Sequence, residues 1–575
     1  MFIRPCYRNK DGKRHAYWAL VESYRTQRGP RQRVVAYLGK LDEAGRLGIK
    51  HAADDTPTSP QKTFFPEPEP EWIEVDAKAV RVENCRQFGG PWLALELIHV
   101  LGLDTFFQET IPSGREDVPW SVMALVLVIA RLCEPSSELS IAENFSRKTA
   151  LCDLLGVPQQ KLYDNRLYRA LDTLLPHKAK LEVFLKEKLG ELFELKYDLL
   201  LYDVTSTYFE GDAKSNPLAQ RGYSRDKRGD CKQVTIGLVV SRCGMPLGYE
   251  VFAGNRADMT TMQEIVETME ARYGKSNRIW VMDRGMASEE NIEFLKEENR
   301  RYIVGTPKSM LKKFEQQLLD EDWHAIREGL DVKLCASPDG QAEMFILCRS
   351  RDRREKEKAM HARFEKRIEA RLISMTERCR KQKRNPLKVA REVGRLLGQN
   401  SRAAGLFDVD VRERNDGGTE LIWKKVKAWQ DWSELSEGCY LLRTNVTDWS
   451  DEELWKAYIQ LTEAEAAFRI HKSDLSIRPV WHQKEDRVLA HILVCFLAYV
   501  LWKTLAGLCD RAGLGNESRR VFEELKDIRV VDVVLPTRQG VEIRKRCVTK
   551  PSEHQKILLE KLGIHLPSRI KTLEM

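Results

Sequence analysis

The stretch YDLLLYDVTSTYFEG, residues 197–211, decides the fold of the middle of the chain. Its apolar run from Leu199 to Tyr202 predicts a buried β-strand that ends at Asp203. Two further β-rich runs follow, KQVTIGLVVS (232–241) and MPLGYEVFA (245–253), and the turn residues RCG separate them. We therefore expect these three strands to form an antiparallel meander.

Helices and strands alternate after the meander. ADMTTMQEIVETMEARYG (257–274) and SEENIEFLKEEN (288–299) predict helices, and RIWVMD (278–283) and RYIVGT (301–306) predict strands. Three strands, helix, strand, helix, strand is the order of an RNase H-like sheet, in which the first and fourth strands are neighbours. We predict an α/β fold built on such a mixed sheet.

Asp203 and Asp283 would end those two neighbouring strands and so lie close together. Cleavage and transfer of a phosphodiester are served by two metal ions about 3.5–4 Å apart, and Mg²⁺ or Mn²⁺ prefers oxygen ligands. A single aspartate at a strand end is more often a turn or cap residue. Only the two together, in these two strands, favour a catalytic role.

The stretch DEELWKAYIQLTEAEAAFRIHK (451–472) predicts one long helix and offers a third carboxylate, Glu465. By helical spacing Tyr458, Leu461, Glu465 and Lys472 share one face of it. An ordinary buried helix would show the same stripe, and a lone glutamate on it is more often solvated or salt-bridged. The catalytic interpretation of Glu465 therefore depends on the two aspartates.

Tyr458, Glu465 and Lys472 resemble the Tyr-x2-Arg-x3-Glu-x6-Lys signature of bacterial insertion-sequence DDE transposases, with Leu461 in place of the arginine. The family's other motifs are resembled by YDVTSTYFEG around Asp203, MDRGMAS around Asp283, GNRAD at 254–258, and RPVWHQKEDRVLAHILVCFLAY after Lys472. The resemblance covers about residues 195–505 and, more loosely, the Arg-rich N-terminal module.

This resemblance implies an RNase H-like core that a β-rich insertion interrupts between the second aspartate and the glutamate. It implies that Asp203, Asp283 and Glu465 hold two Mg²⁺ or Mn²⁺ ions. The implied partners are the terminal inverted repeats of the element and the target DNA, bound by a homodimer on paired ends.

The same resemblance implies that Lys472 contacts a phosphate and that Tyr458 lies near the bound strand. Arg284, Arg469 and Arg478 flank the acidic residues and are expected to bind the DNA backbone. Three tryptophans of the insertion are candidates to stack on a flipped base, although core packing is the commoner role: Trp423, Trp429 and Trp432.

Pattern changes along the chain predict the domain boundaries. Residues 1–50 predict a basic β-hairpin module, 51–75 a Pro-rich linker (DDTPTSPQKTFFPEPEPE at 54–71), and 76–195 a helical domain that we expect to bind DNA. The catalytic core would occupy 196–309 and 456–515, with the insertion at 310–455. The tail, 516–575, carries no chemistry that its sequence identifies.

Positive charge is concentrated in one segment of the insertion. The whole chain has a net charge of +8, yet residues 351–400 alone hold 17 Lys and Arg against 7 Asp and Glu, a net charge of +10. We expect the basic helices at 352–399, Arg353 and Arg354 among them, to bind DNA. A solvated amphipathic helix pair is the alternative explanation.

Composition excludes several classes of protein. The 13 cysteines form no C-x-x-C pair or zinc-ligand spacing, which fits a reducing cytoplasm. The apolar run Val488–Trp502 is short for a membrane span and predicts a buried helix, and the N-terminus has no signal-peptide core. We expect a cytoplasmic protein that is neither exported nor inserted in a membrane.

Two other functions remain possible from the residues alone. A catalytically inactive, transposase-derived DNA-binding protein would keep the fold and the basic segment but would have no reason to keep three acids. A glycosidase with paired carboxylates would leave the basic segment and Lys472 without a purpose.

Overall fold

The computed structural model describes residues 2–10, 13–26, 29–39, 73–275, 277–340, 342–415 and 417–570. The expected Pro-rich linker at 54–71 lies outside these residues. The N-terminal module is a three-stranded antiparallel sheet of β1 (Phe2–Lys10), β2 (Lys13–Thr26) and β3 (Gly29–Gly39).

A nine-stranded mixed sheet organises the centre of the molecule, in the order β10-β11-β12-β15-β9-β8-β5-β6-β7. The predicted meander is present, and β5 lies parallel to β8 as the RNase H-like order requires. The strands are β5 (Leu199–Tyr208), β6 (Gln233–Ser241), β7 (Pro246–Ala253), β8 (Ile279–Met282), β9 (Arg301–Gly305), β10 (His324–Arg327), β11 (Leu330–Ala336), β12 (Met344–Ser350) and β15 (Cys439–Thr444).

The prediction that the first strand ends at Asp203 was wrong, because β5 continues to Tyr208. Its parallel pairing with β8 stops at Tyr202, but its antiparallel pairing with β6 continues along the whole strand. The residues after Asp203, Val-Thr-Ser-Thr-Tyr, are mostly β-branched or aromatic and suit an extended backbone. Asp203 therefore lies within β5, at the point where its neighbour β8 ends.

The two faces of the sheet bury different residues of each strand. On β5, Leu199 and Leu201 join one core with α18 (Leu461–Ser473) and α19 (Glu485–Arg511), whereas Leu200 and Tyr202 join a second core with α10 (Met262–Tyr273) and α11 (Glu289–Glu297). This alternation follows from the two-residue repeat of a strand. Short 3₁₀ turns, η4 (Asp258–Thr261) and η5 (Arg284–Met286), precede the two helices of the second face.

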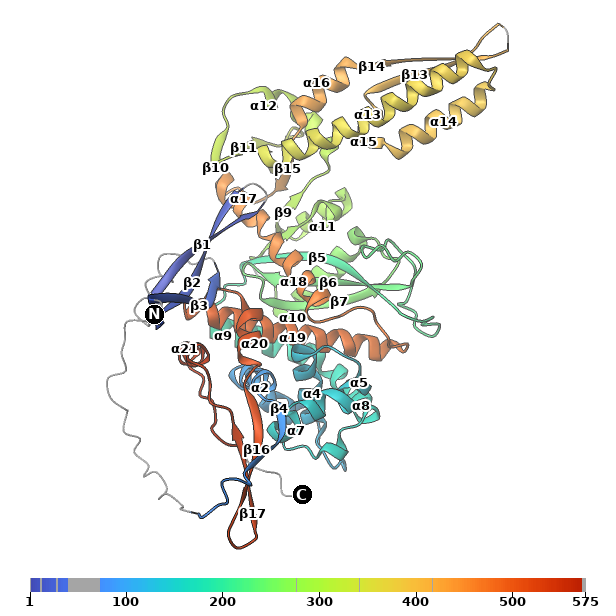
Figure 1. The fold of residues 1–575 in the computed structure, drawn as a ribbon. Coiled ribbons are helices and arrows are strands. Elements are labelled where there is room, and N and C mark those ends of the chain that lie inside the picture. Colours follow the sequence, from blue (N-terminus) through green and yellow to red (C-terminus); the bar gives the residue numbers. More distant parts are fainter. Residues whose placement is uncertain are drawn as a thin grey trace.

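Helix α19 is the predicted buried helix, and it lies between the sheet and the helical domain (Figure 1). It is long and apolar enough to cross a membrane, but 78% of its most apolar window is buried inside the protein. That burial is typical of a core helix.

The prediction of a single helix over 451–472 was also wrong. Helix α17 (Asp451–Ile459) ends and α18 begins around Gln460, so Tyr458 and Glu465 lie on different helices. A capping box of Ser450 and Glu453 fixes the start of α17. Tyr458, on α17, lines a pocket, whereas α18 packs against β5.

The helical domain follows the linker and packs against α19. Its core is formed by apolar side chains of its longer helices, which merge with the core on the α18 side of the sheet. The elements are α2 (Gly89–Leu101), α3 (Leu103–Thr110), α4 (Trp120–Cys133), α5 (Glu138–Ser140), η1 (Ile141–Phe145), α6 (Ser146–Lys148), α7 (Leu151–Leu155), η2 (Gln159–Lys161), α8 (Asp164–Leu174), η3 (Leu175–His177) and α9 (Lys178–Phe193).

The C-terminal tail packs back onto this domain. Its strands β16 (Arg529–Pro536) and β17 (Glu542–Val548) form a sheet with β4 (Arg81–Gln87), next to α20 (Ser518–Leu525) and α21 (Glu553–Leu562). Arg546 of β17 pairs with Asp532 and with Asp153 of α7, both at 2.7 Å. The tail is therefore a structural part of the helical domain.

Much of the expected insertion continues the core sheet. Strands β10, β11, β12 and β15 extend it beyond β9, with η6 (Lys308–Phe314), α12 (Glu315–Leu319) and α16 (Lys427–Ser436) beside them. The chain leaves the sheet after Ser350 and returns at Gly438, where the Ser350 amide donates a hydrogen bond to the Gly438 carbonyl (3.1 Å).

Between these points the chain forms an arm, residues 351–425, that projects beyond the sheet (Figure 1). The basic segment is two helices, α13 and α14, and Asn385 caps the second of them. The arm has its own apolar core. Its elements are α13 (Arg351–Lys381), α14 (Pro386–Gln399), α15 (Ser401–Ala404), β13 (Phe407–Glu413) and β14 (Thr419–Lys425).

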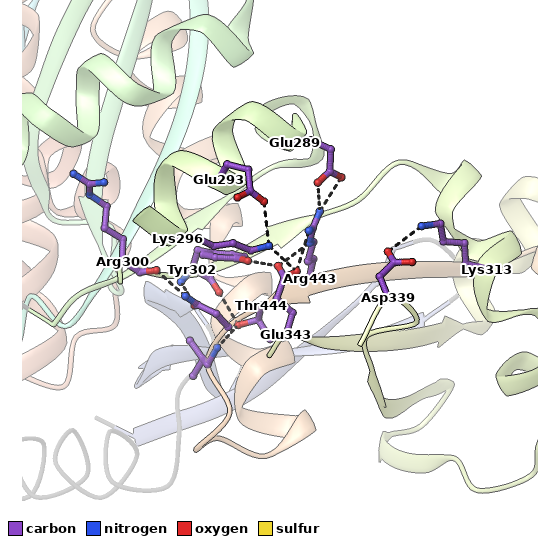
Figure 2. A network of polar contacts seen from close by, with 12 residues as sticks. Glu289, Glu293, Lys296, Arg300, Tyr302, Lys313, Asp339, Glu343, Arg443 and Thr444 are labelled. Carbon is purple, nitrogen blue, oxygen red and sulfur yellow. Dashed lines mark hydrogen bonds and ion pairs between the residues drawn. The ribbon is translucent and has the colours of Figure 1, made fainter. Parts of the chain in front are cut away.

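A buried ion network joins the added strands to the RNase H-like part (Figure 2). Arg443 of β15 donates to both oxygens of Glu343 (2.8 and 2.9 Å) and to Glu289 of α11 (2.9 Å). Tyr302 of β9 also donates to Glu343, and Lys296 pairs with it at 3.1 Å. Since Glu343 is buried, this network links the added strands to the core through an acid that is shielded from solvent.

Candidate active site

Strand register brings Asp203 and Asp283 together. Tyr202 pairs with Met282 in the parallel ladder of β5 and β8; Asp203 follows Tyr202 within β5, and Asp283 directly follows the end of β8. The backbone of Asp283 is still extended, with φ −72° and ψ 161°. Residues in register on adjacent parallel strands point to the same face, so the two carboxylates lie side by side.

Both aspartates lie on the face of the sheet that α17 and α18 cover, since α18 packs on β5 and α17 on β8. They follow the alternation of Leu199 and Leu201 on β5 and of Ile279 and Val281 on β8, all of which face the α18 side. Helix α18 packs on β5 and buries Ala464 and Ala467, while Glu465 is exposed beside them. The three predicted carboxylates are thus contributed by two strands and the helix that covers them.

The pKa of Asp203 depends on the charges of the other two acids. Burial raises the pKa of the Asp203 carboxyl to about 6, and the negative charges of Asp283 and Glu465 contribute to that rise. The Val204 amide donates to Asp203 (2.7 Å), and the charge of Arg225 also favours the ionised form. The carboxylates of Asp283 and Glu465 are therefore near enough to Asp203 for their charges to act on it.

This donor set consists of carboxylate oxygens and suits Mg²⁺ or Mn²⁺. The negative charges of Asp283 and Glu465, which raise the pKa of Asp203, would be neutralised by a bound divalent cation. Within the part of the chain that the structure describes, no three His, Cys, Asp or Glu side chains are grouped in an arrangement that could hold a metal ion. The acids are neighbours, and metal binding would require them to approach further.

A pocket of about 440 Å³ opens next to Asp283, between the core and the added strands. Tyr458 of α17 lines it, and burial and the charge of Asp283 raise the pKa of that tyrosine. Gly305 at the end of β9 leaves room for the Tyr458 hydroxyl, because a side chain on Gly305 would collide with it. Tyr458 is therefore placed at the second aspartate rather than at Glu465.

Two family models match the chain. The transposase DDE domain matches residues 194–501, which is more than half of the chain. The chain belongs to the DDE transposase family. The N-terminal domain of IS1634 family transposases matches residues 3–55 and so assigns the small β-rich module of this transposase to an insertion-sequence group.

A solved structure of the piggyBac transposase in a synaptic complex with hairpin DNA resembles this transposase at a TM-score of 0.36 and 8% identity. The match covers 79% of this chain and 82% of that one. No protein with a curated function matches the transposase.

The pocket of the transposase is rich in cations. Arg284, Lys308, Arg327 and Arg353 all line it. Glu357 of α13 pairs with Arg353 of the same helix (3.1 Å) and with Lys308 of η6 (2.7 Å), and the second pair links the base of the arm to the added strands. Arg284 is exposed, and Arg327 lies over the ring of Trp455 (5.3 Å). Positive charge thus surrounds the Asp283 side of the site.

Lys472 and Arg478 share one buried partner. The Asp226 carboxylate, 5% exposed, pairs with Lys472 (2.9 Å) and with Arg478. Burial lowers the pKa of Lys472, although Asp226 counteracts this. These two predicted phosphate ligands are therefore held in place by an acid, whereas Arg469 and Arg354 are exposed to solvent.

The three candidate tryptophans lie away from the carboxylates. Trp423 and Trp429 pack against the core of the arm, and Trp432 packs against the core beside η6 and β12. The structure instead places Trp455 in the pocket. Sequence reasoning missed Trp455 and Arg225. Trp455 lies three residues before Tyr458, and that helical spacing was the one available signal.

Proposed function

We propose that this transposase cuts and joins DNA at the terminal inverted repeats of its insertion sequence, with Asp203, Asp283 and Glu465 as the catalytic acids. The observation that carries the proposal is the register of β5 and β8, which puts both aspartates on the face of the sheet that is covered by α17 and by α18, the helix bearing Glu465. The raised pKa of Asp203 supports it, because it reflects both other charges.

The same three acids would hold two Mg²⁺ or Mn²⁺ ions. The chemistry that such ions supply when bound is activation of the attacking oxygen and stabilisation of the leaving oxygen. The protein's part is to hold two of the carboxylates on neighbouring interior strands of the sheet and the third on the helix α18 that packs on β5. Asp203 is anchored by the Val204 amide and Asp283 by the Arg284 amide, both at 2.7 Å.

The cations around the pocket would position the strand to be cut. Arg284, Arg327 and Arg353 offer guanidinium groups that match phosphate oxygens. Tyr458 and Asp283 line the same pocket, and Trp455 offers an aromatic face there. On the Glu465 side, Lys472, Arg478 and Arg469 would neutralise the backbone of the same DNA.

The arm would extend this contact along the DNA. Arg354, Lys356 and Lys358 of α13 lie near its base, and further cations continue along the helix. We also propose that a homodimer assembles on paired ends, that target DNA is the second substrate, and that the protein acts in the cytoplasm.

The decisive experiment compares Asp283→Ala with the wild type on DNA that carries the sequences flanking the coding region. We expect the variant to bind this DNA but to lose Mg²⁺-dependent cleavage, since only the acid is removed. Asp212→Asn is the matched control, because Asp212 is exposed on the β5–β6 connection and should leave cleavage unchanged.

Cleavage by Asp283→Ala at the wild-type rate would refute the catalytic assignment. Binding without cleavage by the wild-type protein, in Mg²⁺ and in Mn²⁺, would instead favour a catalytically inactive transposase-derived DNA-binding protein.

A further inference from the structure

Two strongly exposed aromatic side chains lie at the C-terminal end of β5. Tyr223 is 84% exposed and Trp481 is 67% exposed, more than any other Phe, Trp or Tyr of the described residues from 73 to 570. Large apolar side chains on a surface mark sites where another molecule binds when they gather in one place. The location of both side chains at one end of β5 therefore indicates a binding surface.

Contacts with the backbone place both residues beside the end of β5, at residues 208–210. Phe209, directly after β5, bridges to Val480, and the Glu210 amide donates to the Val480 carbonyl (3.0 Å), which places Trp481 at this end. Gln233 pairs with Tyr208, and its side chain donates to the Tyr223 carbonyl (3.1 Å).

The loop that carries Tyr223 is anchored on both sides of it. Gly222 packs so closely on Gly254 that a side chain there would collide with the Gly254 carbonyl. The Arg225 amide donates to the Ser206 hydroxyl of β5 (3.4 Å), and Asp226 is buried against Lys472 and Arg478. The Tyr223 ring is thus presented to solvent by a fixed backbone.

Two arginines lie near this end of β5, Arg225 paired with Asp258 and Arg228 paired with Asp230. Arg225 lies two residues after Tyr223, and its charge acts on Asp203. Arg228 stacks on Tyr208, the last residue of β5 (4.8 Å). Asp203 precedes Tyr208 by five residues, about 17 Å along a strand, the length of about five stacked bases.

We propose that Tyr223 and Trp481 form a stacking surface for unpaired bases of the DNA strand that leads to Asp203. This inference rests on the proposed function. Aromatic faces bind bases of any sequence, and neighbouring cations bind the phosphates between them. The surface would hold the strand open where duplex DNA must be distorted for cleavage.

The test measures binding of a labelled oligothymidylate and of an abasic oligomer of equal length, in buffer without divalent metal. Tyr223→Ala and Trp481→Ala should each weaken oligothymidylate binding by about 5- to 150-fold, the usual range for loss of one stacked base. Binding of the abasic oligomer should not change, because its phosphates remain.

Conservative variants and a surface control make the result specific. Tyr223→Phe and Trp481→Phe keep an aromatic face and should bind oligothymidylate within a few-fold of the wild type. Leu319, 60% exposed at the end of α12, is the control, and Leu319→Ala should bind as the wild type does.

Equal loss of both ligands, or no loss of either, in the alanine variants would overturn the stacking surface. A change in oligomeric state with unchanged oligothymidylate binding would also overturn it and would assign the surface to a protein contact. These outcomes differ from failure of the proposed function, which would appear as absent metal-dependent cleavage by the wild type.

Discussion

Asp203 and Asp283 each lie one residue beyond Tyr202 and Met282, the last pair that joins β5 to β8. The register sets their spacing, so neither side chain can move far from the other without a change in the sheet. Two adjacent carboxylates repel each other in the absence of a cation, and the raised pKa of Asp203 reflects part of that cost.

Replacing Asp203 by asparagine should therefore stabilise the metal-free protein. The folded-state pKa of about 6 lies above the ordinary aspartate value of 3.8, so the ionised form is disfavoured in the folded protein. Asp203→Asn removes this penalty and should raise the free energy of unfolding by about 1–3 kcal/mol at pH 7. Urea denaturation in EDTA measures it.

The stabilisation should depend on pH in one direction. It is absent below pH 3.8, grows as pH rises to about 6, and is constant above that value. Asp212→Asn, on the exposed part of the β5–β6 connection, should show no such trend. A difference between Asp203→Asn and the wild type that does not vary with pH would contradict the buried-acid account.

Gly305→Ala should displace Tyr458, because the added methyl group would collide with the tyrosine hydroxyl. Overpacking of this kind costs about 1–3 kcal/mol of folding free energy. In the double variant, Tyr458→Phe removes the colliding oxygen, so the two changes together should cost less than their sum. A double-mutant cycle by denaturant titration decides it, and strictly additive costs would show that the two residues do not touch.

Glu343→Gln should loosen the junction between the added strands and the core. Glu343 is buried and accepts from Arg443 and Tyr302, so removing its charge leaves a buried guanidinium poorly compensated. Loss of one partner of a buried pair costs about 3–5 kcal/mol. Thermal unfolding monitored by circular dichroism provides the measurement.

Asp339 gives a matched control for that variant. It pairs with Lys313 at 3.1 Å, but both side chains are more than half exposed. Asp339→Asn should change the free energy of unfolding by less than about 1 kcal/mol. Equal effects at Glu343 and Asp339 would mean that the network in Figure 2 does not hold the two parts together.

Charge reversal at the base of α13 should weaken DNA binding. Arg354, Lys356 and Lys358 are the positions to change, and Arg353 is left unchanged because it is engaged with Glu357. Replacing the three by glutamate should lower affinity and reduce the slope of log K against log salt by about 0.9 for each phosphate that is no longer neutralised. Fluorescence anisotropy over a salt series measures both.

Arg538 and Arg544, in the β16–β17 hairpin at the opposite end of the molecule, are the control positions for this experiment (Figure 1). Both are exposed, and their reversal to glutamate should leave the salt slope nearly unchanged. An unchanged slope in the α13 variant would refute a DNA-binding role for the base of the arm.

The strands of the catalytic core and the positions of Asp203 and Asp283 could be predicted because they depend on local patterns. Apolar runs identify buried strands, and each aspartate follows such a run directly. The error at β5 arose because the charged Asp203 interrupts the apolar run. Asp203 and the β-branched residues after it belong instead to one strand that pairs fully with β6.

The pairing of Asp226 with Lys472 could not be predicted, because these residues are 246 positions apart and nothing local links them. The membership of β10–β12 in the core sheet was missed for a similar reason. Alternation identifies a strand but does not state which neighbour it pairs with. Trp455 was missed because its partner Arg327 comes from one of those added strands.

The hydrogen bond between Ser350 and Gly438 closes the base of the long excursion formed by the arm and α16. The ends of β12 and β15 are therefore joined as they would be by a tight hairpin, whatever the length of the chain between them. Shortening or replacing the distal helices should therefore leave the pairing of β12 with β15 intact, and with it the sheet that carries the aspartates.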